Sequence, residues 1–205
     1  MNKTRLEAFS DGVLAIIITI MVLELKTPES NDWESVKHIF PVLAGYLLSF
    51  VFIGIYWGNH HHLLHTVKKV NSRIIWSNLN LLFWLSLIPF ATRWIGENDF
   101  DKISVAVYAT LLSVSGLAYY ILQQSIVVHH HFQDKMKDAL KKQSQKGIIS
   151  LFAYLTSIAT AFIYPIISEI IFVGVAIMWW CPIKILSRQW RNKNKKTALK
   201  TECGF

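Results

Sequence analysis

The residues of this sequence best suited to chemistry are one carboxylate and a group of histidines, all close to the ends of long apolar stretches. Asp11 lies inside "TRLEAFSDGVLAIIITI" (residues 4–20), and His60 begins the histidine run that ends a second apolar stretch. His61 and His65 are four residues apart, a spacing at which two imidazoles on one helix can share a metal ion or a haem. Histidines also commonly mark the end of a helix at a membrane surface, so this spacing alone assigns no ligand.

The composition places these residues in a membrane protein. Of the 205 residues, 53% are hydrophobic and 17% are charged, against about 25% charged in soluble domains, and the mean hydropathy is +0.35. A helix of about 20 apolar residues crosses the roughly 30 Å hydrocarbon layer of a bilayer. Windows of this kind predict an all-α bundle of six transmembrane helices, at residues 6–25, 36–64, 74–96, 103–128, 147–167 and 169–187.

Prolines and charged residues indicate where these spans bend or end. Pro89 and Pro165 are interpreted as tolerated bends inside the third and fifth spans. The charged stretch "FQDKMKDALKKQSQK" before the fifth span fits either a cytoplasmic loop or a helical extension. Residues 1–190 are therefore expected to form one six-helix membrane domain, followed by a basic cytoplasmic tail at residues 191–205.

Membrane topology explains the net charge of +8. With both termini in the cytoplasm, only Lys26, Lys37, Arg93 and Lys102 of the 21 lysines and arginines fall outside. The basic balance therefore predicts an orientation in the lipid bilayer and no nucleic-acid partner. The tail at 191–205 is either a solvated segment or a contact for anionic lipid headgroups, and the sequence leaves both open.

Polar side chains recur at the cytoplasmic ends of consecutive spans, at comparable depths. Because unpaired polar groups are costly inside a membrane, one buried network is the simplest explanation. Asp11 is expected to accept a hydrogen bond from a histidine or from Arg5, although it can also be a first-turn residue with Ser10 as the helix cap. The expected members of the network are Arg5, Ser10, Asp11, Trp57, Asn59, His60, His61, Trp76, Ser77, Asn78 and Asn80.

The first span carries a distinctive motif. The stretch "RLEAFSD" at Arg5–Asp11 matches the R-x-x-x-F-S-D motif of the transmembrane protein 175 family, and the match adds Phe9 to the network. The following "GVLAIIITIMVLEL" resembles the first helix of that family, and "YWGNHHHLLH" resembles the end of its second helix. The family comprises the potassium channels of animal endolysosomes and their prokaryotic relatives. The resemblance implies a multi-pass protein of a bacterial or archaeal plasma membrane, assembled as a homotetramer around a central path for monovalent cations.

The resemblance also assigns the pore to the first helix. In the family, side chains five, nine and twelve residues after the motif aspartate form the narrow part, which here gives Ile16, Ile20 and Leu23, and a threonine implicated in selectivity falls on Thr19. The three aliphatic residues are spaced by four and three, so they form one stripe of a helix, with Thr19 at its edge. Rings of such side chains can exclude water or force partial dehydration of an ion, which costs potassium less than sodium. The chain has no T-V-G-Y-G filter sequence.

The sequence therefore predicts a potassium-selective or potassium-preferring channel with a hydrophobic constriction, with no cofactor, no bound metal other than the permeating K⁺, and no enzymatic activity. A secondary transporter of cations or protons is a second interpretation, but no charge lies in the middle of a span and few glycines interrupt the spans. A haem-binding or metal-binding membrane protein that uses the histidines is a third. No nucleophile paired with a base stands out, which argues against an enzyme.

Overall fold

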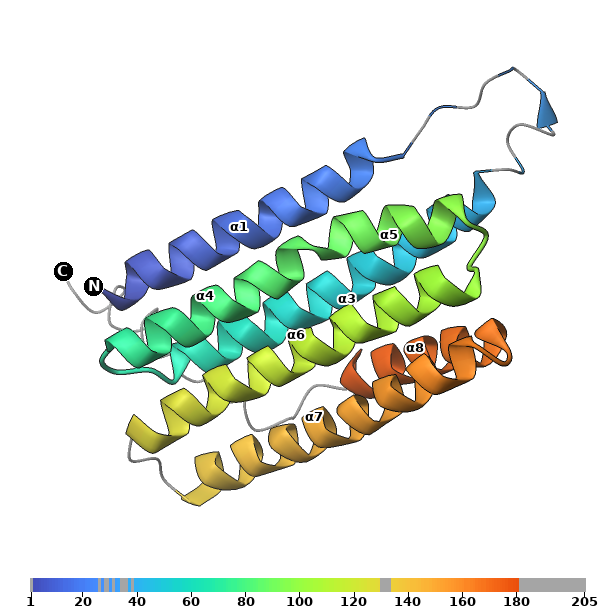
Figure 1. Ribbon diagram of the computed structural model, residues 1–205. Coiled ribbons are helices and arrows are strands. Elements are labelled where there is room, and N and C mark those ends of the chain that lie inside the picture. Colours follow the sequence, from blue (N-terminus) through green and yellow to red (C-terminus); the bar gives the residue numbers. More distant parts are fainter. Residues whose placement is uncertain are drawn as a thin grey trace, which may run out of the picture.

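The computed structural model describes residues 2–25, 27, 30, 32, 33, 37, 39–129 and 134–180, and the structural statements below concern these residues. The described residues form an elongated bundle of helices without a strand (Figure 1). The all-α fold expected from the composition is thus confirmed. The predicted basic tail and residues 181–187 of the predicted sixth span lie outside the described residues. The helices are α1 (Lys3–Leu23), α3 (Phe40–His65), α4 (Ser72–Ser86), α5 (Ile88–Glu97), α6 (Lys102–His129), α7 (Asp134–Ala161) and α8 (Pro165–Trp180).

The described helices lie at the positions of the six predicted spans when α4 and α5 are counted together. By length and composition, α1, α3, the α4–α5 pair and α6 are each able to cross a membrane. The hairpin of α7 and α8 occupies the positions of the last two predicted spans, and the described part of α8 is an apolar helix of 16 residues. Of the two readings of the charged stretch before the fifth span, the helical extension is correct, because α7 begins at Asp134 and continues to Ala161.

The two prolines have different effects on the spans. The third span is interrupted at Leu87, which ends α4 and precedes α5, and Pro89 lies in the first turn of α5, so the predicted bend is confirmed. The bend predicted at Pro165 is wrong, because this residue begins α8. Proline suits the first turn of a helix, since its fixed backbone angle is helical and its missing N–H group would have no partner there.

The first helix lies at one side of the bundle, and the α7–α8 hairpin lies at the other (Figure 1). α1 packs against α3, α4 and α5, whereas α6 packs against α4, α5, α7 and α8. The close approach of α5 to α3 depends on Gly96, where an added Cβ would lie 2.7 Å from the Cα of Val42. α5 and α3 therefore approach each other closely at Gly96.

Basic residues gather at one end of the bundle. The start of α1, the turn between α3 and α4, and the start of α7 all lie at this end (Figure 1). Exposed lysines and arginines lie in or next to these segments, namely Lys68, Lys69, Arg73 and Lys137. The charge asymmetry expected from the sequence thus has a structural counterpart, and the assignment of this end to the cytoplasm stays a prediction.

Candidate pore face and its polar anchors

One face of α1 is packed against the rest of the bundle. Its side chains recur every three or four residues and are at most 2% exposed, namely Leu6, Ser10, Leu14, Ile17 and Met21. This spacing is that of one side of an amphipathic helix. Because almost every residue of α1 beyond the motif is apolar, the sequence pattern alone cannot show which side is packed. The contacts with α3, α4 and α5 decide it.

The opposite face of α1 carries all four predicted pore residues. Ile16 is 58% exposed, Ile20 41% and Leu23 81%, and Thr19 is exposed beside them. The face extends over the length of α1, since the motif residue Phe9 is also exposed. The four positions therefore share one aliphatic surface that the described part of the chain leaves open.

Thr19 offers an oxygen atom to this surface. Its Oγ1 donates a hydrogen bond to the carbonyl oxygen of Ile16, at 2.8 Å. A hydroxyl group has one proton to donate and two lone pairs that accept. Because the proton is used within the helix, the lone pairs of this hydroxyl remain available to accept from another partner.

Ser10 on the packed face is held by a chain of buried hydrogen bonds. His60 on α3 approaches the Oδ1 of Asn78 on α4 through its Nε2, at 2.6 Å, and the Nδ2 of Asn78 donates to the Oγ of Ser10 at 2.9 Å. Ser10 in turn donates to the carbonyl oxygen of Leu6, at 2.9 Å. Since Asn78 Oδ1 can only accept, His60 carries its proton on Nε2. Three helices are joined in this way, as the sequence predicted for these polar residues.

The motif aspartate has a different partner from the one expected. Asp11 accepts a hydrogen bond from the indole Nε1 of Trp57, at 3.0 Å, where a histidine or Arg5 was expected. The rings of Trp57 and His61 lie 5.9 Å apart between centroids, and His61 packs edge-on against His65 at 4.6 Å. The histidines thus support the tryptophan by ring contacts.

Lys3 adds an anchor at the start of α1 that the sequence reasoning missed. Its Nζ donates to the carbonyl oxygen of His65, at 2.9 Å, and lies 3.5 Å from Glu7 Oε1. The carbonyl of His65 belongs to the last turn of α3, where backbone acceptors lack helical partners. A backbone acceptor carries no side-chain signal in a sequence, so this contact could not be found from residue types.

Two further predicted members of the network bind on the other side of α3 and α4. Asn59 accepts a hydrogen bond from Gln143 on α7, at 3.2 Å, and the hydroxyl oxygens of Ser77 and Ser125 lie 2.8 Å apart. Gln143 was missed, because it lies in the charged stretch of undecided structure. The expected single network is therefore divided between the α1 side and the α6–α7 side of the bundle.

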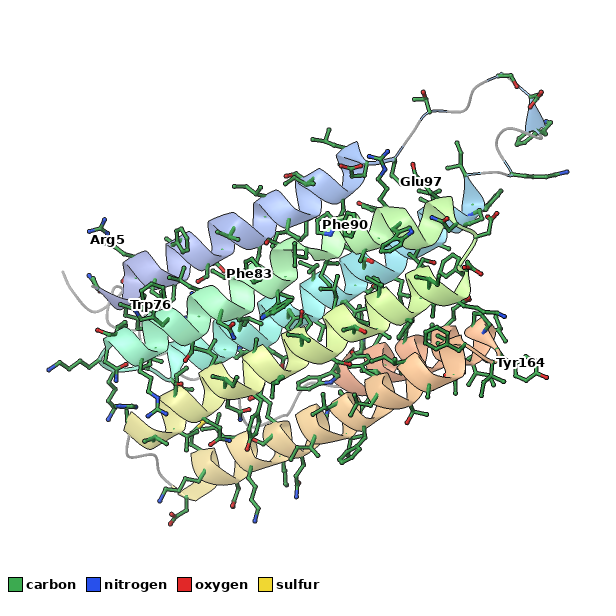
Figure 2. The ribbon with its side chains drawn as sticks, viewed as in Figure 1. Arg5, Trp76, Phe83, Phe90, Glu97 and Tyr164 are labelled. Carbon is green, nitrogen blue, oxygen red and sulfur yellow. The ribbon has the colours of Figure 1, made fainter. Side chains whose placement is uncertain are left out.

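Five predicted network residues form no side-chain hydrogen bond or ion pair within the described part of the chain: His61, which makes the ring contacts given above, and the four residues that follow. Arg5 is exposed at the start of α1 and points away from the bundle (Figure 2). Phe9 is 52% and Trp76 71% exposed, and Asn80 is exposed on α4. Arg5 and Phe9 are four residues apart and lie on the same face of α1 as Ile16.

An ion-pair cluster holds the other end of α1. The Nη1 of Arg93 on α5 lies 2.7 Å from Glu24 Oε2, and its Nε lies 3.2 Å from Glu97 Oε1. Glu24 directly follows Leu23, the last predicted pore residue. The sequence reasoning placed these charges outside the membrane but did not pair them, because residues 24 and 93 are far apart in the chain.

The histidines form no metal centre in the described residues. No group of three or more histidine, cysteine, aspartate or glutamate side chains lies close enough to hold an ion there. His130, His131, Cys181 and Cys203 are outside the described residues. The edge-on contact of His61 with His65 is a packing contact between rings.

Comparison with known proteins identifies the family. Residues 5–89 match the family model described as "Endosomal/lysosomal potassium channel TMEM175". A potassium channel of Chryseobacterium sp. (strain P1-3) is 50% identical over 188 residues, which cover 92% of this chain and 97% of that one. The chain belongs to the TMEM175 family of potassium channels. The resemblance inferred from the first helix is thus confirmed.

Other TMEM175 relatives agree over most of the chain. A potassium channel of Chamaesiphon minutus is 30% identical over 177 residues, covering 78% of this chain and 84% of that one. A crystal structure described as a lysosomal potassium-selective channel TMEM175 homolog from Chamaesiphon minutus superposes with a TM-score of 0.76, at 26% identity, over 86% of this chain and 95% of that chain. Membership of a channel family favours the channel interpretation over a transporter, a haem protein or an enzyme.

Proposed function

We propose that this TMEM175 protein is a potassium channel in which four copies of α1 surround a shared axis and turn the Ile16–Leu23 face toward passing monovalent cations. The observation that carries this proposal is the division of α1 into two faces. One face is packed and hydrogen-bonded to the subunit, while the face with Ile16, Ile20 and Leu23 stays exposed. A helix fixed on one side and open on the other suits a pore wall.

The chemistry of this face fits a gate that acts by excluding water. Rings of isoleucine and leucine dewet when narrow, and when wider they strip part of an ion's hydration shell, which costs potassium less than sodium. The Thr19 oxygen replaces part of the lost water. Arg5 and Phe9, which extend the same face, are assigned to contacts between subunits near the cytoplasmic mouth.

The proposed location is the plasma membrane of a prokaryote, with both termini in the cytoplasm. The end of the bundle that carries Lys68, Lys69 and Arg73 then faces inward, as the positive-inside rule requires. Glu24 and Glu97 then lie at the outer mouth, where their charges raise the local cation concentration over about 8–10 Å at physiological salt.

Potassium flux from liposomes containing the purified protein tests the pore face. Ile16→Asn puts a polar group at the constriction, and a barrier lower by about 1.4 kcal/mol makes flux tenfold faster, so an increase of this order is expected. Ile170→Asn on α8 is the matched control, since Ile170 is 65% exposed on the side of the bundle away from α1. Unchanged flux in Ile16→Asn, with both variants assembled normally, would remove Ile16 from the pore.

The same liposomes test the selectivity role of Thr19. Thr19→Val keeps the side-chain shape but removes the hydroxyl oxygen, so the preference for potassium over sodium should fall while flux continues. Thr110→Val on α6 is the control, because Thr110 is also exposed and bonds the carbonyl oxygen of its own helix at 2.8 Å. Equal potassium-to-sodium ratios in all three proteins would exclude Thr19 from the selectivity step.

A second candidate cargo is the proton. A human relative that is 33% identical over 146 residues, covering 63% of this chain and 29% of that one, is named an endosomal/lysosomal proton channel. Proton entry is measured in the same liposomes with an internal pH dye while a potassium carrier clamps the membrane potential. A proton flux absent from protein-free liposomes supports this candidate, and its absence leaves potassium as the cargo.

A further inference from the structure

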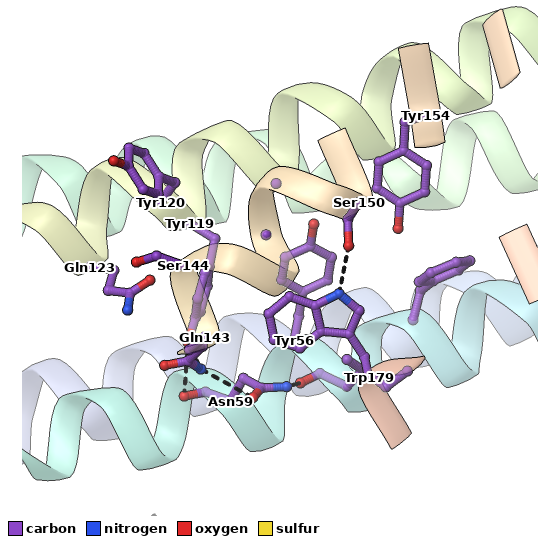
Figure 3. Close-up of a pocket in the computed structure, with 14 residues that line it drawn as sticks. Tyr56, Asn59, Tyr119, Tyr120, Gln123, Gln143, Ser144, Ser150, Tyr154 and Trp179 are labelled. Carbon is purple, nitrogen blue, oxygen red and sulfur yellow. Dashed lines mark hydrogen bonds between the residues drawn. The ribbon is translucent and has the colours of Figure 1, made fainter. Parts of the chain in front are cut away.

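A separate cavity lies inside the subunit, between α3, α6, α7 and α8 (Figure 3). It is on the side of α3 away from α1, and none of its lining residues belongs to α1. Its volume is about 40 Å³, counted over the positions that the centre of a water-sized sphere can occupy. On this measure one water needs about 10–15 Å³. The cavity therefore has room for about three water-sized groups.

The amide oxygen of Gln143 is the polar atom that the protein leaves unmatched here. Gln143 is 1% exposed, and its Nε2 donates to the hydroxyl of Tyr119 at 2.8 Å and to Asn59 Oδ1 at 3.2 Å (Figure 3). Its Oε1 has no hydrogen-bond partner within the described residues. A buried carbonyl oxygen without a donor is strongly unfavourable. Because Gln143 lines the cavity, a molecule inside it can supply the missing donor.

The other groups around the cavity define the chemistry of that molecule. Tyr56 and Tyr154 both line it, and neither hydroxyl forms a hydrogen bond to the described residues. The indole of Trp179 is already bonded to Ser150 Oγ, at 2.7 Å. No charged side chain lines the cavity, and Lys146 Nζ lies 5.9 Å from the centre of the Trp179 ring, which disfavours a cation. A small neutral molecule with an O–H donor fits best.

We propose that this cavity is a binding site for a small neutral O–H donor, which bonds to Gln143 Oε1 and reaches the hydroxyls of Tyr56 and Tyr154. Two sources share this chemistry: a cluster of about three waters, or one short-chain alcohol whose alkyl part lies against the aromatic lining. The proposal concerns the folded subunit and does not depend on what the channel conducts.

The position of the site connects it to the anchors of α1. Tyr56 and Asn59 face the cavity, while Trp57 and His60, their neighbours on α3, bind Asp11 and Asn78 on the other side. The occupant therefore lies between the α7–α8 hairpin and the segment of α3 that holds α1. Filling or emptying the cavity changes the support of that segment.

Two glycine variants separate the cavity from its surroundings. A Cβ added at Gly116 would lie 3.8 Å from the hydroxyl of Tyr56, an ordinary contact, so Gly116→Leu fills the cavity from α6. Gly174→Leu is the control, because Gly174 is exposed on α8, does not line the cavity and has no atom within 4 Å of an added Cβ. Gly116→Ala is a milder filling variant for the case in which Gly116→Leu does not fold.

The test uses two measurements on the purified full-length protein. The first is a structure that resolves water molecules, determined without alcohol and with ethanol. The second is thermal unfolding, measured without alcohol and across an ethanol titration. Water density bonded to Gln143 Oε1, with no saturable ethanol effect, supports the site with water as occupant. Ethanol density and a saturable rise of the unfolding midpoint, lost in Gly116→Leu but kept in Gly174→Leu, support the site with alcohol as occupant. An empty or closed cavity, a lipid chain within it, or a protein donor on Gln143 Oε1 overturns the proposal.

Discussion

The two ends of α1 are attached to the subunit by different kinds of contact. Near its start, Ser10 is completely buried and belongs to a hydrogen-bond chain through Asn78 to His60. At its other end, Glu24 meets Arg93 through an ion pair whose side chains are 34% and 42% exposed. Buried polar bonds are costly to break because the separated groups find no water. A partly exposed ion pair contributes little and weakens with salt.

This difference bears on where the proposed pore can change its width. Ile16 lies less than two turns after Ser10, whereas Leu23 directly precedes Glu24. The part of α1 from Ser10 to Ile16 is therefore the more firmly fixed, and the end at Leu23 is the more easily displaced. α5 makes the Leu23 end easier to displace, because α5 is a short helix that is separated from α4 at Leu87 and carries the Arg93 that pairs with Glu24. Movement of α5 would be transmitted through Arg93 and Glu24 to the Leu23 end of α1.

The largest expected effect comes from breaking the buried chain at Asn78. Asn78→Leu keeps the side-chain volume but leaves the His60 Nε2 proton without an acceptor and removes the donor to Ser10. A loss of about 1–3 kcal/mol in the free energy of unfolding follows from these two changes. Thermal or denaturant unfolding in detergent, with chromatography for assembly, measures it. Asn80→Leu is the matched control, because Asn80 is exposed and has no side-chain bond to the described residues. Equal stability of both variants would show that the chain does not anchor α1.

A smaller effect is expected at Asp11 and Trp57. Asp11→Asn keeps the oxygen that accepts from the indole, whereas Asp11→Val removes it, so only the valine variant should lose this bond. A double-mutant cycle with Trp57→Phe should give a coupling energy of about 0.6 kcal/mol, the average for hydrogen bonds between membrane helices. Unfolding measurements on the four proteins provide the value. If the coupling is zero while Asp11→Asn is damaging, the charge of Asp11 acts on a partner other than Trp57.

The sequence predicted the positions of the helices and the depth of the polar residues better than the side of the helix on which each polar side chain lies. Apolar length identifies a membrane helix, so the crossings near α1, α3 and α6 were found almost at their observed ends. α3, however, is apolar over most of its length, and periodicity cannot orient such a helix. Asn59 and His60 are consecutive, so they point about 100° apart around the helix. One therefore reaches α7 and the other α4, although a single network was expected for both.

Partners distant in sequence were the part of the site that could not be predicted. Ser10, His60 and Asn78 were grouped correctly because all three lie at the same depth of an apolar span, where an unpaired polar group is costly. Arg93 and Glu24 are partly exposed at the end of the bundle opposite the basic residues, where water is an alternative partner, so no such cost demanded a pair. The exposure of Arg5 and Phe9 in one subunit also has no signal in the sequence, and under the proposed assembly their partners lie in a neighbouring subunit.

The smallest effect on stability is expected at the Arg93 cluster, and salt reveals it. Raising the salt from about 0.01 M to about 1 M shortens the Debye length from roughly 30 Å to 3 Å, so the contribution of the Glu24–Arg93 pair should fade over this range. Arg93→Gln should be slightly less stable than the unchanged protein in low salt and equally stable in high salt. Its potassium flux should also change, because the Leu23 end of α1 loses its ion pair with α5. Lys102 is an exposed lysine at the start of α6, on the same end of the bundle. Lys102→Gln is therefore the control for the loss of one positive charge at the proposed outer mouth. If Arg93→Gln and Lys102→Gln alter flux equally at every salt concentration, Arg93 acts only through its charge, and the outer end of α1 is held by packing against α5.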